Sequence, residues 1–156
     1  MSAPSSNAPI REVIANLWDL HACGQWIAIP TNGVLRANGE NVMGAGLAGQ
    51  AAQRFPEFPW VVGNAIGIHG NLPVAWPQAR LLSIPTKSHW RTPSILSIIT
   101  ESVIKVFRLL DEHQIRALYC PHLGCGLGQL RWAHVREAIR PLIDDRFIFV
   151  SNTDWR

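Results

Sequence analysis

A glycine-rich stretch places the strongest constraint on how this chain can fold. Residues 41–50 contain three glycines and no acidic side chain, and they lead into residues 51–55, which we predict to be helical until Pro56 ends the helix. Glycine allows backbone N–H groups to approach a ligand closely. A helix N-terminus adds unpaired N–H donors and the positive end of the helix dipole. The stretch therefore predicts an anion site, most often for phosphate, at a strand-to-helix junction.

A second stretch has the same character. Residues 124–128 read Gly-Cys-Gly-Leu-Gly and lie between an apolar strand and a helical segment. Neither loop is a P-loop, because neither continues into Gly-Lys-Ser/Thr, and neither spells the full dinucleotide fingerprint. Either loop alone could be an ordinary tight turn. The pair, at matching junctions, favours a site that holds a diphosphate from both sides.

Composition limits the class of protein. A chain of 156 residues with 47% hydrophobic and 16% charged residues predicts a globular domain, which we place at residues 10–156 behind a flexible tail at 1–9. The net charge of +3 permits contact with nucleic acid without requiring it. Cysteines 23, 120 and 125 form neither a CxxC pair nor an even disulfide framework, which favours a reducing cytoplasm and no metal site. No apolar run approaches the length of a membrane span, and the first nine residues lack the core of a signal peptide.

Strands alternate with helices along the chain. Apolar runs bounded by turn residues predict strands at 11–17, 26–29, 80–84, 115–120 and 147–150. A 3.6-residue period predicts helices at 93–112, with Thr92 as N-cap and Pro93 at the first turn, and at 132–144, where Pro141 kinks or restarts the helix. Residues 18–24 are predicted to form a turn, and residues 56–77 extended chain with short strands or a hairpin near 70–71. The alternation indicates a three-layer α/β domain whose ligand lies at the carboxyl ends of the strands.

Three stretches together resemble a macrodomain, the α/β module that binds ADP-ribose. The first is the strand at 26–29 with Asn32 and residues 42–48 (Val-Met-Gly-Ala-Gly-Leu-Ala), followed by a helix that ends at Phe55-Pro56. The second is residues 121–132 (Pro-His-Leu-Gly-Cys-Gly-Leu-Gly-Gln-Leu-Arg-Trp), and the third is residues 84–91 (Ile-Pro-Thr-Lys-Ser-His-Trp-Arg). They are similar to the branch that contains the terminal ADP-ribose protein glycohydrolase and the DarG-type DNA ADP-ribosyl glycohydrolase antitoxins.

The resemblance implies an α/β/α fold with a central mixed, largely parallel sheet, and it assigns roles to residues. Residues 42–47 would hold the phosphate nearer the distal ribose, residues 124–128 would wrap the diphosphate, and Lys87 would be catalytic. Asn16 or Asp19 would contact the adenine, and Asn32 would line the distal ribose. The candidate ligand-binding residues are Asn16, Asp19, Asn32, Val42, Met43, Gly44, Ala45, Gly46, Leu47, Gly124, Cys125, Gly126, Leu127, Gly128 and Asn152. Position 128 departs from the protein glycohydrolase, which has a catalytic Asp there, and this glycine favours the DarG-type branch.

Other polar and aromatic residues leave alternatives open. Lys87 is either catalytic, a ligand for phosphate, or a solvated surface lysine. His89 and His122 are candidates for proton transfer or are hydrogen-bonded loop histidines. Cys125 is interpreted as a small residue packed under the loop. Trp90, Arg91 and Arg131 could grip single-stranded nucleic acid or pack at the rim.

The implied function is that of an ADP-ribosyl hydrolase that needs no cofactor. Its target would be ADP-ribosylated thymidine in single-stranded DNA or, alternatively, ADP-ribosylated acidic side chains of proteins. A module that binds ADP-ribose without hydrolysis would carry the same two glycine loops. A phosphatase acting on ADP-ribose phosphate is a weaker alternative. The chain is expected to be a cytoplasmic monomer that does not contact a membrane.

Overall fold

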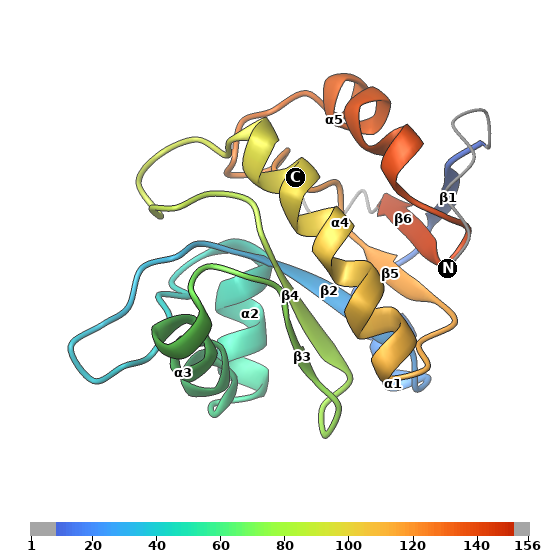
Figure 1. Ribbon diagram of the computed structural model, residues 1–156. Coiled ribbons are helices and arrows are strands. Elements are labelled where there is room, and N and C mark those ends of the chain that lie inside the picture. The colour runs from blue at the N-terminus through green and yellow to red at the C-terminus, as the bar shows by residue number, and fades with distance from the viewer. Residues whose placement is uncertain (1–8, 152–156) are drawn as a thin grey trace.

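The computed structural model describes residues 9–151, and all its strands form one sheet. The strand order is β1-β6-β5-β2-β4-β3 (Figure 1). All neighbouring pairs are parallel except β3 and β4, so the prediction of a mixed, largely parallel sheet is confirmed. The strands are β1 (Arg11–Ile14), β2 (Trp26–Thr31), β3 (Val74–Trp76), β4 (Leu81–Pro85), β5 (Leu118–Cys120) and β6 (Phe147–Ser151).

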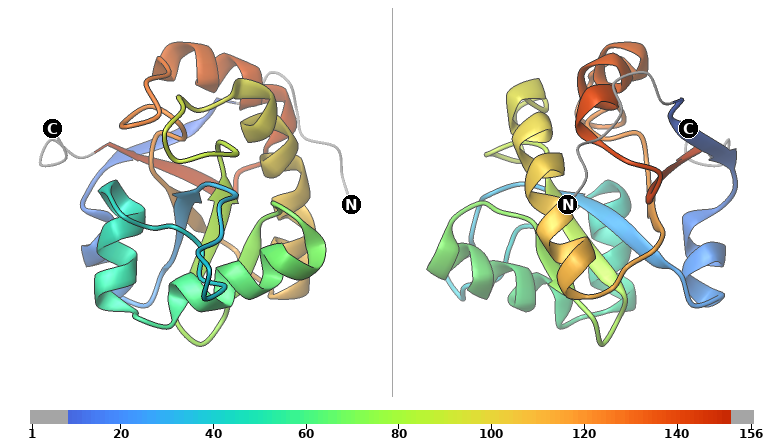
Figure 2. Two further views of the ribbon diagram at one scale, coloured as in Figure 1. Left: turned by 90° about the vertical axis from the view of Figure 1, so that its left-hand side faces the viewer. Right: turned by 45° about the vertical axis from the view of Figure 1, so that its right-hand side comes forward.

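Helices cover both faces of this sheet and complete the three predicted layers (Figure 2). One face packs against α1 (Leu17–Ala22), α2 (Gly46–Arg54) and α3 (Phe58–His69), and the other against α4 (Leu96–Glu112) and α5 (Trp132–Ile139). Side chains of the central strand β2 alternate between the two cores, because successive residues of a strand point to opposite faces. Ile27 and Ile29 lie in the first core, and Ala28 in the second. Among the residues described, no helix combines the length and the apolar character needed to cross a membrane.

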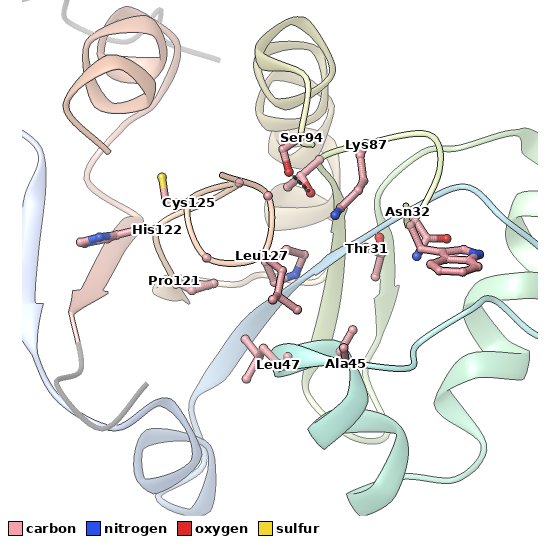
Figure 3. A pocket seen from close by; sticks show the side chains of 18 of the residues that line it. Thr31, Asn32, Ala45, Leu47, Lys87, Ser94, Pro121, His122, Cys125 and Leu127 are labelled. Carbon is pink, nitrogen blue, oxygen red and sulfur yellow. Dashed lines mark hydrogen bonds between the residues drawn. The ribbon is translucent and has the colours of Figure 1, made fainter. Parts of the chain in front are cut away.

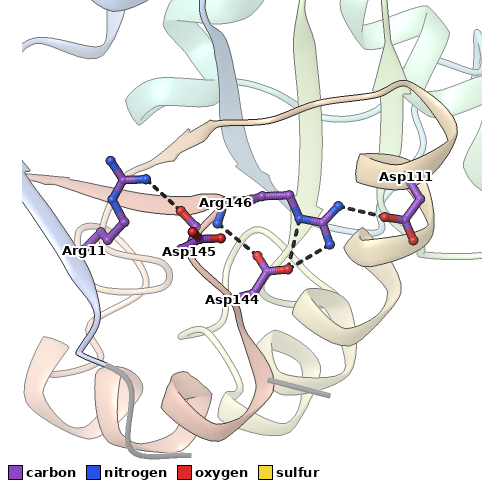
Figure 4. Close-up of polar contacts among 5 residues, drawn as sticks. All are labelled: Arg11, Asp111, Asp144, Asp145 and Arg146. Atoms are coloured by element: carbon purple, nitrogen blue, oxygen red, sulfur yellow. Dashed lines mark hydrogen bonds and ion pairs between the residues drawn. The ribbon is translucent and has the colours of Figure 1, made fainter. Parts of the chain in front are cut away.

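A cluster of charged residues fixes the beginning of β6 (Figure 4). Arg146 donates to Asp111 of α4 at 2.7 Å and to Asp144 at 3.0 Å, and its second Nη lies 2.8 Å from the same Asp144 oxygen. Arg11 of β1 donates to the carbonyl of Asp145 at 2.9 Å. These contacts hold the amino end of β6 against β1 and α4. The carboxyl end of β6 lies at the opposite edge of the sheet.

The predicted turn at 18–24 is wrong, because most of it forms helix α1. The side chain of Asn16 caps this helix and accepts hydrogen bonds from the backbone N–H groups of Trp18 and Asp19 at 2.9 and 3.2 Å. Leu17, Trp18 and His21 form its buried face. The predicted strand at 11–17 accordingly ends at Ile14. The N-cap preference of Asn was the local signal for this helix.

The prediction of extended chain through 56–77 is wrong over 58–69, which form helix α3. Pro59 lies in the first turn, where a missing N–H costs nothing. Phe58, Val62 and Ile66 recur at every fourth position and are buried. Gly63 is required for close packing, because a Cβ there would lie 2.0 Å from the carbonyl oxygen of Gly39. Strand β3 then forms the antiparallel edge at 74–76.

Helix α4 begins at Leu96, so Thr92 is not its N-cap. Thr92 instead donates through Oγ1 to the carbonyl of His89 at 3.0 Å, and the N–H groups of Ser94 and Ile95 bind the carbonyls of Gly128 and Thr86. The hydroxyl of Thr92 is therefore bound within the loop that precedes the helix and does not cap it. The predicted strand at 115–120 covers only 118–120, and helix α5 ends at Ile139 and restarts as a 3₁₀ turn containing Pro141, as predicted.

Candidate ADP-ribose site

A cavity of about 820 Å³ lies where the parallel strands β2, β4, β5 and β6 end (Figure 3). Residues at or just beyond these four carboxyl ends line it, namely Thr31 and Asn32, Thr86 and Lys87, Pro121 and His122, and Val150 and Ser151. Loops at 42–48 and 124–128 supply the other walls. This is the edge at which open α/β sheets bind their ligands, and the volume suits a small organic ligand.

Two asparagines hold the first glycine loop. Asn32 donates to the carbonyl of Val42 at 2.8 Å, and its side-chain oxygen accepts from the N–H of Val34 at 2.9 Å. The fully buried Asn41 donates to the carbonyls of Asn32 and Val34, each at 3.0 Å. Because these amides pair the carbonyls of Asn32, Val34 and Val42, they hold the chain in one defined path to the loop. Asn32 thus both lines the cavity and shapes the loop.

The first loop presents unpaired backbone donors. Helix α2 starts at Gly46, its N-cap Ala45 provides no side-chain acceptor, and its first turn contains no acidic residue. Within residues 9–151, the N–H groups from 44 to 48 have no hydrogen-bond acceptor. They lie with the positive end of the helix dipole at the wall of the cavity. This arrangement suits a phosphate group.

The second loop is closed by its own backbone and offers a second set of donors. The N–H of Leu130 binds the carbonyl of Gly124 at 2.9 Å, and that of Gln129 binds the carbonyl of Gly126 at 3.1 Å. Among the described residues, the N–H groups of Gly126, Leu127 and Gly128 have no acceptor. Like the first loop, it therefore carries successive unpaired amide donors at the wall of the cavity, three in this case.

The two loops meet across the cavity. In Figure 3, Leu127 lies on one side and Ala45 and Leu47 on the other. A Cβ built on Gly46 would lie 3.3 Å from Cδ1 of Leu127, whose side chain is 65% exposed. Gly46 also has φ +60°, which disfavours other residues. The loops thus form facing walls that can contact opposite sides of one diphosphate.

Lys87 supplies the charge of the site. It follows β4 and extends into the cavity, where Nζ donates to the carbonyl of Thr92 at 3.2 Å (Figure 3). Its own carbonyl accepts from the side chain of Asn71 at 3.2 Å. Burial lowers the pKa of the Lys87 ammonium from its ordinary value, because desolvation penalises the charged form. Lys87 is therefore held in place and is deprotonated more readily than an exposed lysine.

The cavity wall contains no carboxylate among the residues described. Among the residues that the structure describes, Lys87 is the only lysine or arginine that lines it, and no aspartate or glutamate does. An anionic ligand therefore meets no repulsion from acidic side chains of the described walls. The paired carboxylates on which most glycosidases depend are missing from these walls. No group of three potential metal-binding side chains is present within residues 9–151.

Cys125 and His122 line the cavity but are poor candidates for chemistry. Burial raises the pKa of the Cys125 thiol to about 11, so it stays protonated and does not act as a thiolate nucleophile. The imidazole of His122 stacks on Trp132 with centroids 4.2 Å apart and the rings nearly parallel. Burial lowers the pKa of His122, while Glu12 raises it and Arg136 lowers it. Cys125 thus packs against the hydrophobic core, as interpreted from the sequence, and His122 packs against the ring of Trp132.

Most of the predicted ligand-binding residues line this one cavity, including all those at 42–47 and 124–128 together with Asn32 and Lys87. Asn16 and Asp19 do not line it, and the oxygen of Asn16 is used to cap α1, so the adenine contact stays a prediction. Asn152 lies outside the described residues. The walls contributed by Thr31, Ser94 and Val150 were not predicted, although the position of Thr31 and Val150 at strand ends was an available signal.

Comparisons with known proteins agree with this geometry. A curated relative, "DNA ADP-ribosyl glycohydrolase" of Thermus aquaticus, is 30% identical over 117 residues, which is 69% of this chain and 32% of the relative. The solved macrodomain of Thermus aquaticus DarG has a TM-score of 0.72 at 27% identity and covers 91% of this chain and 97% of that one. The macrodomain of Mycobacterium tuberculosis DarG has a TM-score of 0.69 at 28% identity, covering 92% and 98%.

No protein-family model matches the chain. The chain spans about a third of the length of the first curated relatives that it matches. The solved macrodomains, by contrast, are covered almost completely, at an identity that shows more than a shared fold. Together with the two glycine loops and the lysine after β4, these similarities show that the chain belongs to the macrodomain family, in the branch that contains the DarG macrodomains.

Proposed function

We propose that this macrodomain is an ADP-ribosyl glycohydrolase that removes ADP-ribose from thymidine in single-stranded DNA. The names of the curated relatives support the reaction and the DNA target. ADP-ribosylated acidic side chains of proteins are the alternative target. We further propose that the chain acts as a cytoplasmic monomer without a cofactor.

The two loops would bind the diphosphate of ADP-ribose. Five successive N–H groups from 44 to 48 and three from 126 to 128 lack acceptors among the described residues, and they belong to facing walls. Amide donors that are already oriented lose little entropy when a phosphate arrives. The distal ribose would then lie towards Lys87 and Asn32, which line the same cavity.

The observation that carries the proposal is a partly buried amine in a cavity whose described walls hold no carboxylate. In the proposed first step, uncharged Lys87 attacks C1 of the distal ribose. A bond forms from Nζ to C1 as the bond from C1 to the target breaks, and the electron pair of that bond leaves with the target. The target takes up the proton that Nζ loses. Water then hydrolyses the adduct, releases ADP-ribose and restores the amine.

The test uses two substrates in parallel, ADP-ribosylated single-stranded DNA and an ADP-ribosylated acidic protein. Release of ADP-ribose is measured for the unmodified protein, for Lys87→Ala and for Lys105→Ala, which removes the exposed lysine of α4. We expect turnover on DNA, loss of most of it in Lys87→Ala, and no change in Lys105→Ala. Affinity for ADP-ribose should change by less than about tenfold, or ~1.4 kcal/mol, in Lys87→Ala.

The other outcomes separate the alternatives. Turnover only on the protein substrate would show that the target is an acidic protein side chain and not DNA. Binding of ADP-ribose without release from either substrate would make the chain a binding module. If affinity and turnover fell together in Lys87→Ala, the lysine would be a phosphate ligand and would have no separate role in the chemistry.

A further inference from the structure

Trp90 is an aromatic side chain placed at the cavity with a large exposed surface. It lines the cavity together with Lys87, which is three residues earlier in the same loop, and it is 46% exposed. A tryptophan that is merely part of a core would be covered by its neighbours, as Trp18 is at 8% exposure. Trp90 therefore adds apolar surface at the cavity, and the described chain leaves nearly half of it uncovered.

The neighbours of Trp90 in sequence extend this surface. The His89 ring lies 5.4 Å from the Trp90 ring at an interplanar angle of 28°, and the Arg91 guanidinium lies 4.7 Å from the indole centroid. His89 and Arg91 are themselves exposed. Planar rings and guanidinium groups are the side chains on which unpaired nucleobases stack.

The loop that carries these residues is well anchored. Its first half is held by Asn71, which donates to the carbonyl of Lys87, and by Gly33, whose N–H binds the carbonyl of Ser88 at 3.0 Å. Its second half is held by Ser94, whose N–H binds the carbonyl of Gly128 at 2.9 Å. A surface fixed in this way is pre-organised for a ligand, which reduces the entropic cost of binding.

The charge of the loop favours a polyanion. Residues 86–95 contain Lys87 and Arg91 and no acidic residue. A nucleic acid strand offers both a phosphate for the guanidinium and a flat base for the ring, whereas an acidic peptide offers only the charge. The combination therefore favours single-stranded DNA over an acidic protein segment.

We propose, resting on the proposed function, that His89, Trp90 and Arg91 form a platform for the DNA strand beside the bond to be broken. Trp90 stacks on a nucleobase of the strand, and Arg91 contacts its phosphate. The platform would select a DNA-linked ADP-ribose over free ADP-ribose, because it belongs to the Lys87 loop and not to the two glycine loops that are proposed to hold the diphosphate.

The test measures binding, which does not depend on turnover. Anisotropy of a labelled oligothymidine reports strand affinity, and calorimetry reports ADP-ribose affinity. The variants are Trp90→Ala, Trp90→Phe, Arg91→Ala and, as a matched control, Trp60→Ala, which removes a tryptophan of α3 that is 55% exposed and does not line the cavity. Trp90→Ala should weaken strand binding by roughly 5- to 100-fold and leave ADP-ribose affinity within about threefold. Trp90→Phe should retain most strand binding, and Trp60→Ala all of it.

Arg91→Ala should lower the salt dependence of strand binding by about one phosphate contact, or ~0.7 in the logarithmic slope. The platform is overturned if oligothymidine does not bind, if Trp90→Ala leaves its affinity unchanged, or if ADP-ribose affinity falls as far as strand affinity. If the unmodified protein shows this binding pattern but does not hydrolyse DNA-linked ADP-ribose, the proposed function is refuted and the platform is retained. Hydrolysis of DNA-linked ADP-ribose unaffected by Trp90→Ala would refute the platform alone.

Discussion

Lys87 has to satisfy two opposing requirements at the scale of a single residue. A charged ammonium attracts a diphosphate, whereas only the uncharged amine can attack C1 of the distal ribose. Burial lowers the pKa of Lys87, and no carboxylate among the residues described lines the cavity to raise it again. The shift therefore increases the reactive fraction at a given pH while the loop amides continue to bind phosphate.

This reasoning predicts how the rate depends on pH. With saturating ADP-ribosylated DNA, single-turnover hydrolysis should rise with pH between about 6 and 10 and level off below the ordinary lysine pKa of about 10.5. The sign follows because raising the pH deprotonates Nζ. Rapid-quench measurements across this range check it. A rate that falls as pH rises would show that the charged form is required, and Lys87 would then act by stabilising the leaving group.

The glycines of the site fall into two groups. At Gly44 and Gly126 an added Cβ meets no atom within 4 Å, so these positions border open space. At Gly128 a Cβ would lie 2.1 Å from Oγ of Ser94 and 2.5 Å from the carbonyl oxygen of Gly124. Because the carbonyl of Gly124 belongs to the backbone, an Asp such as the resemblance places at position 128 in the protein glycohydrolase would not fit here without a change in the loop. The first group leaves room that a ligand can occupy.

We predict opposite effects for substitutions in these two groups. Gly126→Val should abolish ADP-ribose binding in calorimetry and change the free energy of unfolding by less than about 1 kcal/mol, as expected at an exposed position. Gly128→Ala should lower the free energy of unfolding by about 1–3 kcal/mol through overpacking. Urea denaturation measures the second quantity. Normal ADP-ribose affinity in Gly126→Val would show that the second loop is an ordinary turn.

At the scale of elements, the sequence predicted those structures whose signals are local. Strands β2 and β4 were predicted from apolar runs that precede a proline, although each strand includes that proline and β2 continues to Thr31. Helix α4 shows an uninterrupted helical period. Helix α3 was missed because its glycines and Pro59 are typical of turns when they are considered without the loop at 39–41. That loop packs against Gly63, and the N–H of Asn41 binds the carbonyl of Pro59 at 2.8 Å. The role of Gly63 is thus explained by a contact between distant segments.

Two glycines of α3 test this explanation. Gly63→Ala should destabilise the protein by about 1–3 kcal/mol, because its methyl group would lie within 2.9 Å of three backbone atoms at 39–41. Gly67→Ala is the matched control on the same helix, where the nearest atom would be 3.8 Å away. It should be neutral or stabilise by up to about 1 kcal/mol, since alanine favours helix. Equal effects in urea denaturation would contradict the packing role of Gly63.

At the scale of the whole molecule, the cavity depends on sheet order. The two glycine loops and the Lys87 loop were visible in the sequence because each has its own motif. The remaining walls at Thr31, Ser94 and Val150 were not, because their meeting depends on β2 pairing with both β4 and β5 and on β6 pairing with β5. No local pattern specifies that order. Residues from 30 to 151 thus contribute to one cavity only after the sheet has formed.

A ligand that joins such distant segments should stabilise the entire fold. ADP-ribose at ~100 times its dissociation constant should add about 2.7 kcal/mol to the free energy of unfolding, which for a chain of this size raises the melting temperature by roughly 5–10 °C. Micromolar affinity, about 8 kcal/mol, is reasonable for a diphosphate held by two loops. Scanning calorimetry with and without ADP-ribose measures the shift, and Gly126→Val provides the matched protein that should melt normally and not respond. A melt that is unmoved by ADP-ribose, yet shifted by another nucleotide, would reject ADP-ribose as the ligand while leaving the fold unchanged.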